Sequence, residues 1–125
     1  MRLMGFCLNE KMKVIPEYNT AYISLTLEEL RRFHFEPGDT EGFVNYPLSI
    51  KRIVFSAFFM EKHDHVKVSL RSKGSFATND FCAAHFNGGG HRNASGGETK
   101  LSLKEALALF RELLPQYSEL SGKDC

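Results

Sequence analysis

The amino-acid sequence predicts an α+β fold, a mixed β-sheet of about five strands with helices packed on it, in a single domain spanning residues 1–125. Three observations lead to this prediction. The chain is long enough to bury one sizeable core. Its hydrophobic content of 42% and charged content of 25% are ordinary for a globular domain. Segments with a two-residue hydrophobic period are mixed with segments of helical period along the chain.

The first half of the chain predicts two strands followed by two short helices. The strands are expected over residues 3–8 and 13–25. Thr26 and Glu29 fit a capping box, in which each side chain accepts the backbone N–H of the other residue, and this box would start the first helix. The second helix is expected between residues 39 and 50, although a proline lies inside it.

Two further strands are expected in the middle of the chain. Ile53–Met60 is a nearly continuous apolar run, which predicts a central strand buried on both faces. His63–His65 reads as a polar hairpin turn. Residues 66–71 then alternate, which predicts a strand with an apolar face and a polar, basic face. The basic face carries Lys67, Ser69 and Arg71.

The last third predicts a helix, a strand and a second helix. Thr78 is expected to cap a helix that runs through Phe86 and ends at the glycine run. A strand is expected over residues 91–99. A second capping box, formed by Ser102 and Glu105, predicts the start of a helix with one apolar side.

Composition and charge argue against several classes of protein. The formal net charge is only +1, so a strongly electrostatic, sequence-blind nucleic-acid binder is not expected. No apolar run is long enough to span a membrane, and no membrane partner is expected. The three cysteines (Cys7, Cys82 and Cys125) are an odd number without the spacing of a disulfide framework or a zinc site, so a reducing, cytoplasmic location is expected.

The most informative segment is residues 87–97, which read Asn-Gly-Gly-Gly-His-Arg-Asn-Ala-Ser-Gly-Gly. Glycines let a backbone approach a ligand closely, and His91 and Arg92 can donate hydrogen bonds to an anion. The spacing is not that of a P-loop, and the expected helix-then-strand order excludes a dinucleotide-binding fingerprint. Two interpretations stay open, an anion-binding nest and a plain helix C-cap.

Arg71 is a second candidate for binding phosphate. A guanidinium on a rigid strand suits bidentate contact with a phosphate, and a solvated strand face is the alternative interpretation. His63, Asp64 and His65 do not make a complete metal site, so no metal ligand is predicted. No arrangement of nucleophile and base, or of paired carboxylates, is recognisable, so no catalytic residue is predicted in this chain.

Three segments in order give the chain a resemblance to a known family. They are Asp39-Thr-Glu-Gly-Phe-Val-Asn-Tyr46, Val66-Lys-Val-Ser-Leu-Arg-Ser-Lys73 and Gly88-Gly-Gly-His-Arg-Asn-Ala-Ser-Gly-Gly97. Together they resemble the DHH-associated domain at the C-terminus of DHH-family phosphoesterases. The branch that is most similar holds the nanoRNase/pAp-phosphatase proteins, which are related to RecJ-type exonucleases and also described as exopolyphosphatase-related. The resemblance extends from Leu3 to about Tyr117.

The resemblance implies that this chain is the substrate-binding half of an enzyme. The N-terminal catalytic DHH domain, absent from this sequence, would hold two divalent metals, expected to be manganese ions, that activate water. No cofactor is then expected on this chain, which alone would be inactive. The parent would hydrolyse short oligonucleotides or 3′-phosphorylated nucleotides. The expected partners are short RNA or DNA or a phosphorylated nucleotide, the chain's own DHH domain, and a second copy in a homodimer.

The resemblance also implies which residues bind substrate. Arg71 would contact a substrate phosphate with Ser72 beside it, and His91 would bind near the scissile or terminal phosphate. Ser95 replaces an alanine that is common in the family, and whether it adds a contact is left open. The full set of expected substrate- or phosphate-binding residues is Arg71, Ser72, Gly88, Gly89, Gly90, His91, Arg92, Asn93 and Ala94.

Two alternative functions remain from the sequence. One is a stand-alone RNA- or DNA-binding module, which would use exposed aromatic side chains along a basic groove. The other keeps the phosphoesterase but gives the parent enzyme a different substrate, either polyphosphate or a cyclic dinucleotide.

Overall fold

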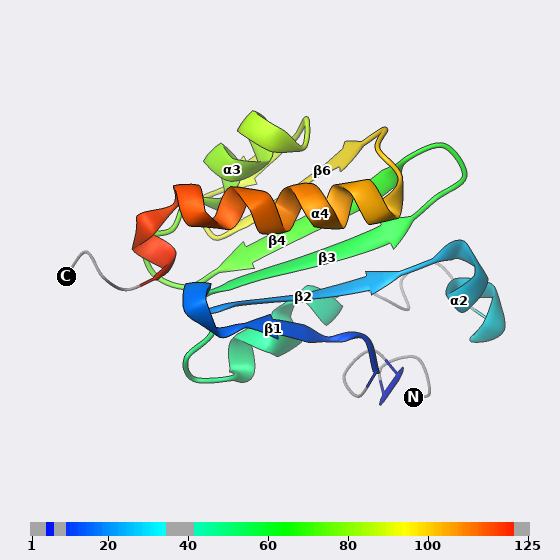
Figure 1. The fold of residues 1–125 in the computed structure, drawn as a ribbon, viewed down its shortest axis with the longest axis horizontal. Helices are drawn as coiled ribbons and strands as arrows, with labels where there is room; N and C mark the ends of the chain where they lie inside the picture. Colours follow the sequence, from blue (N-terminus) through cyan, green and yellow to red (C-terminus); the bar gives the residue numbers. More distant parts are fainter. Residues whose placement is uncertain (1–4, 7–9, 35–41, 122–125) are drawn as a thin grey trace.

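The computed structural model describes residues 5–6, 10–34 and 42–121, which form one six-stranded mixed sheet with helices on it (Figure 1). The α+β class is therefore confirmed. The strands are β1 (Lys13–Ile15), β2 (Thr20–Leu25), β3 (Phe55–Glu61), β4 (Val66–Ser72), β5 (Gly89–His91) and β6 (Ala94–Thr99). The helices are α2 (Leu27–Arg32), α3 (Thr78–His85) and α4 (Leu103–Leu113), with 3-10 helices η2 (Pro16–Tyr18), η3 (Phe43–Ser49), η4 (Leu114–Gln116) and η5 (Ser118–Leu120).

The strand order is β1-β2-β3-β4-β6-β5, and only the β2–β3 pair is parallel. A parallel pair needs a crossover connection, and here the crossover carries α2 and η3. Figure 1 shows α4 in front of the sheet and η3 behind it. The crossover therefore covers the face of the sheet opposite α4.

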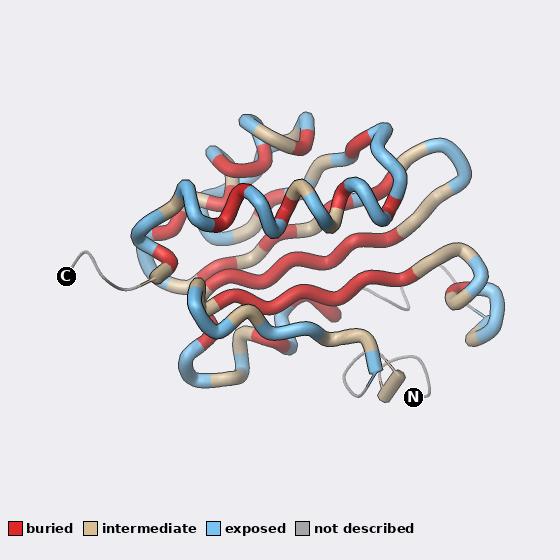
Figure 2. The backbone as a smooth tube through the Cα atoms, viewed as in Figure 1, coloured by how far each residue is buried: buried red, intermediate tan, exposed pale blue. Residues whose placement is uncertain are grey.

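Two apolar clusters bury the two faces of the central strands. The larger cluster lies under α3 and α4 and includes Phe55, Phe59, Phe81 and Phe110. The smaller one lies under α2 and η3 and includes Ile23, Leu25, Leu30, Phe43, Val44, Phe58 and Met60. Every residue of β2 and all but the last residue of β3 are buried (Figure 2), which confirms the prediction of a strand buried on both faces.

Both predicted capping boxes are present. The Thr26 hydroxyl accepts the Glu29 backbone N–H at 3.0 Å, and a carboxylate oxygen of Glu29 accepts the Thr26 N–H at 2.9 Å. Ser102 and Glu105 exchange the same two hydrogen bonds at 3.1 and 3.0 Å, which starts α4. These bonds satisfy N-terminal backbone donors that the helices themselves leave unpaired.

The 3-10 helix η5 is tied to the first strands of the sheet. Asn19, at the turn between η2 and β2, has a left-handed φ of 49°. Its side-chain amide donates to the Leu120 carbonyl at 2.8 Å, across 101 residues of sequence. This bond and the burial of Leu120 hold η5 against the start of β2. None of the described helices combines the length and apolarity that a membrane crossing requires.

Two of the predicted strands are each divided into two in the structure. The strand expected over 13–25 is interrupted by Pro16–Tyr18, since proline lacks a donor for the sheet and Asn19 reverses the chain. The strand expected over 91–99 is a hairpin that turns at Arg92 and Asn93, a pair without the usual hairpin signal of Asn-Gly or Asp-Gly.

Two predictions fall largely or partly on undescribed residues. The strand expected over 3–8 lies mostly outside the described residues, and Gly5 and Phe6, which are described, have helical backbone. The predicted helix over 39–50 lies partly outside them as well, and its described part is the 3-10 helix η3. Pro47 lies inside η3 and cannot donate an α-helical hydrogen bond.

Two predictions about α3 were wrong. The N-cap of α3 is Ala77, without a side-chain cap, and Thr78 is the first helical residue. The glycine run does not end the helix either, because the left-handed position after it is taken by Asn87, with a φ of 51°. Asparagine tolerates this conformation better than most residues, which leaves the following glycines free to form β5.

Candidate functional site

One half of the sheet is covered on a single face. Along β4, Val66, Val68 and Leu70 are buried toward α3 and α4, while Lys67, Ser69 and Arg71 point to the other face, as the alternation predicts. On that other face η3 lies over β2 and β3 and reaches β4, and no described element extends over β6 and β5. We call this surface of β4, β6 and β5 the open face.

Strand register brings the predicted phosphate-binding side chains into one row on the open face. Arg71 of β4 pairs with Ala94 of β6, which pairs in turn with His91 of β5. Paired residues share a face of the sheet, and neighbouring strands are about 4.8 Å apart, so the Arg71 and His91 backbones are about 10 Å apart. Among the described residues, the methyl group of Ala94 lies between them. We call this set the Arg71–His91 row.

The two polar side chains of the row retain donors for a ligand. Nη1 of Arg71 donates to the Leu70 carbonyl at 2.8 Å and to the Ser95 carbonyl at 3.4 Å, which holds the guanidinium near the sheet. Its other N–H groups have no partner among the described residues, and neither does the imidazole of exposed His91. The row therefore offers a forked cation and an imidazole on either side of a small residue.

Ser72 and Asn93 lie beside the row and hold it in place. Ser72 is buried on the face of β4 opposite Arg71, and its hydroxyl donates to the Phe76 carbonyl at 2.7 Å. The Asn93 amide donates to that hydroxyl at 2.9 Å, and the Ser72 N–H donates to the Asn93 carbonyl at 3.1 Å. The structure thus does not bring Ser72 together with Arg71 and His91. It places Ser72 where it ties the hairpin to β4.

Thr78 also holds the hairpin, and the sequence analysis did not identify it as part of the site. Its backbone N–H donates to the Arg92 carbonyl at 2.6 Å, and its hydroxyl lies 2.9 Å from that carbonyl and 3.2 Å from the His91 carbonyl. The Arg92 side chain donates to the Ser75 carbonyl at 3.1 Å, so it bends toward the loop before α3. A threonine just before a predicted helix is normally interpreted as its N-cap, so the sequence did not indicate that Thr78 holds the hairpin.

Gly88 and Gly97 let α3 pack closely on the sheet. A Cβ on Gly88 would lie 2.1 Å from the Gly96 carbonyl oxygen and 2.8 Å from the Cys82 sulfur. A Cβ on Gly97 would lie 2.2 Å from the Phe86 carbonyl oxygen and 2.9 Å from the same sulfur. Neither position has room for any side chain.

The middle of the glycine run is extended and belongs to the sheet. Gly90 has a φ of +143°, and a Cβ there would lie 2.8 Å from the Ala94 carbonyl oxygen. A Cβ on Gly89, on the open face, would meet no atom of the described part of the chain within 4 Å. Gly89 and Gly90 thus belong to an edge strand rather than to a nest. Gly88 keeps part of the helix-cap interpretation, because its N–H donates to the Cys82 carbonyl at the end of α3, at 3.4 Å.

Other candidate groups lie away from the open face. Burial raises the pKa of the Cys82 thiol, which keeps it protonated and unreactive. Ser95, whose contact was left open, is buried on the face under α3. His63–His65 is the predicted hairpin turn, where His65 lies 2.7 Å from the Asp64 carboxylate and lowers its pKa. Within the described ranges no three His, Cys, Asp or Glu residues are placed to hold a metal.

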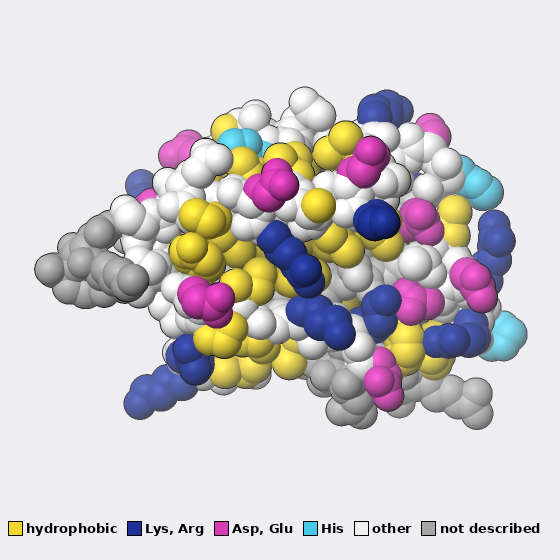
Figure 3. Space-filling model, viewed as in Figure 1, with side chains coloured by type: hydrophobic (Ala, Val, Ile, Leu, Met, Phe, Trp, Pro, Cys, Tyr) yellow, Lys and Arg dark blue, Asp and Glu magenta, His cyan; other side chains and the backbone are white. Residues whose placement is uncertain are grey.

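The face covered by α4 carries side chains of both charge signs. Figure 3 looks onto that face and shows Lys and Arg side chains interspersed with Asp and Glu. Mixed charge does not create the positive stripe that sequence-blind binding of nucleic acid requires. This agrees with the net charge of +1.

Comparison with known proteins identifies the family. The DHHA1 domain family matches residues 19–117. The chain therefore belongs to the DHHA1 domain family, as the three ordered sequence segments predicted.

Similar proteins are longer than this chain. It is 36% identical over 91 residues to a 3′,5′-cyclic-nucleotide phosphodiesterase of Helicobacter pylori (strain ATCC 700392 / 26695), an alignment that covers 66% of this chain and 26% of that protein. The crystal structure of an exopolyphosphatase-related protein from Bacteroides fragilis is 50% identical, with a TM-score of 0.92 over 98% of this chain and 36% of that one. The chain thus spans about a quarter to a third of these two relatives.

A more distant structure shares the fold alone. The pGpG-specific phosphodiesterase from Vibrio cholerae has a TM-score of 0.64 at 19% identity, over 92% of this chain and 38% of that one. The overall fold is therefore shared at low sequence identity.

Proposed function

We propose that this chain is the substrate-binding domain of a phosphoesterase that hydrolyses short oligonucleotides or 3′-phosphorylated nucleotides, as nanoRNase/pAp-phosphatase proteins do. The observation that carries the proposal is the Arg71–His91 row on the open face. A phosphate between the two side chains takes up forked hydrogen bonds from Arg71 and a further one from His91. Ala94 leaves the space that the phosphate occupies.

Hydrolysis itself is assigned to another domain of the same protein. The described residues hold no cluster suited to a metal, and the open face carries no paired carboxylates. In this proposal two divalent metals, manganese ions, would be held by a preceding DHH domain and would supply an activated water. The longer relatives support this division, because each has room for a further domain.

The proposal is tested by binding adenosine 3′,5′-bisphosphate to the 125-residue chain and measuring affinity by calorimetry. Arg71→Ala removes a charged hydrogen-bond donor, and such bonds contribute about 1.5–3 kcal/mol, so affinity should fall about 10- to 100-fold. Lys104→Ala is the matched control, since Lys104 is exposed on α4 and far from the open face. Equal affinities of wild type and Arg71→Ala would contradict the proposal.

The names of two relatives indicate other substrates to test, a cyclic nucleotide and polyphosphate. One relative is described as a cyclic-nucleotide phosphodiesterase and another as exopolyphosphatase-related. Competition of tripolyphosphate and of a cyclic dinucleotide against adenosine 3′,5′-bisphosphate ranks these ligands on one protein. A stand-alone nucleic-acid module would instead show affinity that rises with RNA length.

A further inference from the structure

The face of the sheet under α4 has a local excess of positive charge between α4 and β1. Figure 3 shows Lys and Arg side chains gathered over β1 and β2 in the middle of the view, with Asp and Glu further out. Lys13 of β1 and Arg111 of α4 are both exposed here. Glu112 follows Arg111 in the sequence but lies about 100° further around the helix, so it does not neutralise this side.

Tyr22 of β2 brings these two cations together. Lys13 pairs with Tyr22 across β1 and β2, so the two side chains share the face under α4. A guanidinium N–H of Arg111 donates to the Tyr22 hydroxyl, and the guanidinium carbon lies 5.3 Å from the centre of the Tyr22 ring. The Tyr22 hydroxyl therefore keeps its own proton to donate, and the other N–H groups of Arg111 have no partner among the described residues.

Ser24 places an unpaired hydroxyl beside them. It lies two residues after Tyr22 in β2, so it is on the same face, and its exposed fraction is only 7%. The Tyr22 ring contacts Phe59, which pairs with Ser24 across β2 and β3, so the ring leans toward Ser24. The Ser24 hydroxyl has no hydrogen-bond partner in the described part of the chain. Burying a hydroxyl without a partner is costly, and a bound ligand would supply one.

The neighbouring ion pair does not use these groups. The Lys11 ammonium lies 3.0 Å from the Glu29 carboxylate, and Glu29 also belongs to the first capping box. Lys13 has no acidic partner within the described ranges. One guanidinium, one ammonium and two hydroxyls thus lie around one place on this face. We call the set of Lys13, Tyr22, Ser24 and Arg111 the Ser24 site.

We propose that the Ser24 site binds a phosphate group, either as inorganic phosphate or as part of a small phosphorylated molecule. The planar guanidinium contacts two oxygens side by side, and the ammonium supplies a point charge. The two hydroxyls donate to the oxygens that remain. A phosphate has enough oxygens for all of these donors, whereas a carboxylate has only two, so the donor set favours phosphate.

The Ser24 site is separate from the Arg71–His91 row. Tyr22 packs in the apolar cluster under α4, whereas Arg71 points to the other face of the sheet. A phosphate bound at one site therefore has the sheet between it and the other site. The Ser24 site is a second binding site, and its occupancy does not depend on the proposed function.

The test is an NMR titration of the Arg71→Ala chain with inorganic phosphate at constant ionic strength, so that Arg71 contributes nothing. We expect the amide signals of Tyr22 and Ser24 to shift together, with a dissociation constant of about 1 mM or lower. Ser24→Ala keeps every charge and removes only the unpaired hydroxyl. It should weaken phosphate binding about tenfold, with a melting temperature in the absence of phosphate no lower than before.

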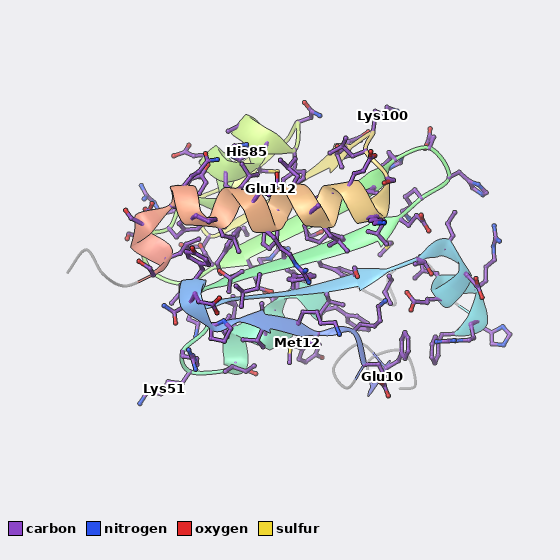
Figure 4. The ribbon with its side chains drawn as sticks, viewed as in Figure 1. Glu10, Met12, Lys51, His85, Lys100 and Glu112 are labelled. Atoms are coloured by element: carbon purple, nitrogen blue, oxygen red, sulfur yellow. The ribbon has the colours of Figure 1, made fainter. Side chains whose placement is uncertain are left out.

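A pair of lysine variants separates a site from general charge. Lys13→Ala should weaken phosphate binding at least about threefold. Lys51→Ala removes the same charge from an exposed lysine away from α4 (Figure 4) and should leave the affinity unchanged. Titration with glycerol 3-phosphate then distinguishes the two sources of the phosphate. An affinity equal to that of inorganic phosphate supports a phosphorylated molecule, and one at least about tenfold weaker supports the free ion.

Three other results would overturn the proposal. Equal weakening by Lys13→Ala and Lys51→Ala would show general screening of charge. An unchanged affinity in folded Ser24→Ala would show that the hydroxyl does not meet the phosphate. Tighter binding of acetate than of phosphate would mean that the site takes carboxylates, such as those of an acidic peptide. If adenosine 3′,5′-bisphosphate fails to bind the open face while this titration succeeds, the proposed function fails and the Ser24 site stands.

Discussion

The glycines of this domain differ in whether they tolerate a side chain. Gly97 is closed off by the Phe86 carbonyl and Cys82, whereas Gly89 faces open space. Gly97→Ala must displace backbone, and overpacking of this kind costs about 1–3 kcal/mol in unfolding free energy. Gly89→Ala should change it by less than about 0.5 kcal/mol. Urea unfolding of the two variants measures the difference, and equal stabilities would show that α3 does not pack against Gly97 as described.

His85 gives stability a pH dependence near neutrality. It lies on α3 (Figure 4), with Nε2 2.7 Å from the Tyr117 hydroxyl, and burial lowers its pKa below the ordinary value of 6.5. The unfolded chain therefore binds the proton more readily than the folded one. Stability contributed by the neutral ring is complete above pH 6.5 and is lost as pH falls from 6.5 through the folded-state pKa.

The measurement is the melting temperature between pH 7.5 and 5 for wild type and His85→Gln. The wild-type value should fall with decreasing pH more steeply than that of the variant. Glu29 and Glu105 also have lowered pKa values, from their hydrogen bonds in the capping boxes and, for Glu29, from Lys11, but they protonate at more acid pH. Parallel curves for the two proteins would show that His85 is not the group responsible.

At the scale of elements, the β5–β6 hairpin is held by its neighbours in the fold. Thr78 at the start of α3 binds the His91 and Arg92 carbonyls from one side, and Asn93 binds Ser72 from the other. Thr78→Val keeps the shape of the side chain and removes the hydroxyl, which should lower the unfolding free energy by about 1–3 kcal/mol.

The same change should act on the ligand through His91. We expect Thr78→Val to weaken binding of adenosine 3′,5′-bisphosphate several-fold at a temperature where the variant is fully folded, because the hairpin carrying His91 is less fixed. Thr78→Ser retains the hydroxyl and should restore both stability and affinity. Restored stability without restored affinity would mean that Thr78 does not position His91.

The elements that local chemistry determines were predictable from the sequence. The two capping boxes and the alternation of β4 depend on residues a few positions apart, and the structure confirms them. The positions that failed lack a local signal. Thr78 was mistaken for a cap because its hydroxyl partners are 13 and 14 residues away. The glycine run was interpreted as a nest or a helix C-cap because Arg92 and Asn93, at the turn of the β5–β6 hairpin, do not carry the usual hairpin signal.

At the scale of the whole molecule, the sheet has two halves with different surroundings. β2 and β3 are enclosed by helices on both faces, and β4, β6 and β5 are enclosed on one. The continuous apolar run of β3 and the alternation of β4 already indicated this difference. The sequence did not predict the order of strands across the open face, because β6 lies between β4 and β5 although β5 comes before it in the chain. That insertion places Ala94 between Arg71 and His91.

The bond from Asn19 to Leu120 bears on how the chain folds during synthesis. It joins residues 101 positions apart, and the parallel β2–β3 pair also joins distant segments. Contacts of long sequence separation must wait for the intervening chain and slow the search for the native state. A ribosome releases the C-terminal part of this domain last, so the bond from Asn19 to Leu120 cannot form until η5 has emerged. In a protein that carries a preceding domain, that domain can therefore fold on the ribosome well before this one is complete.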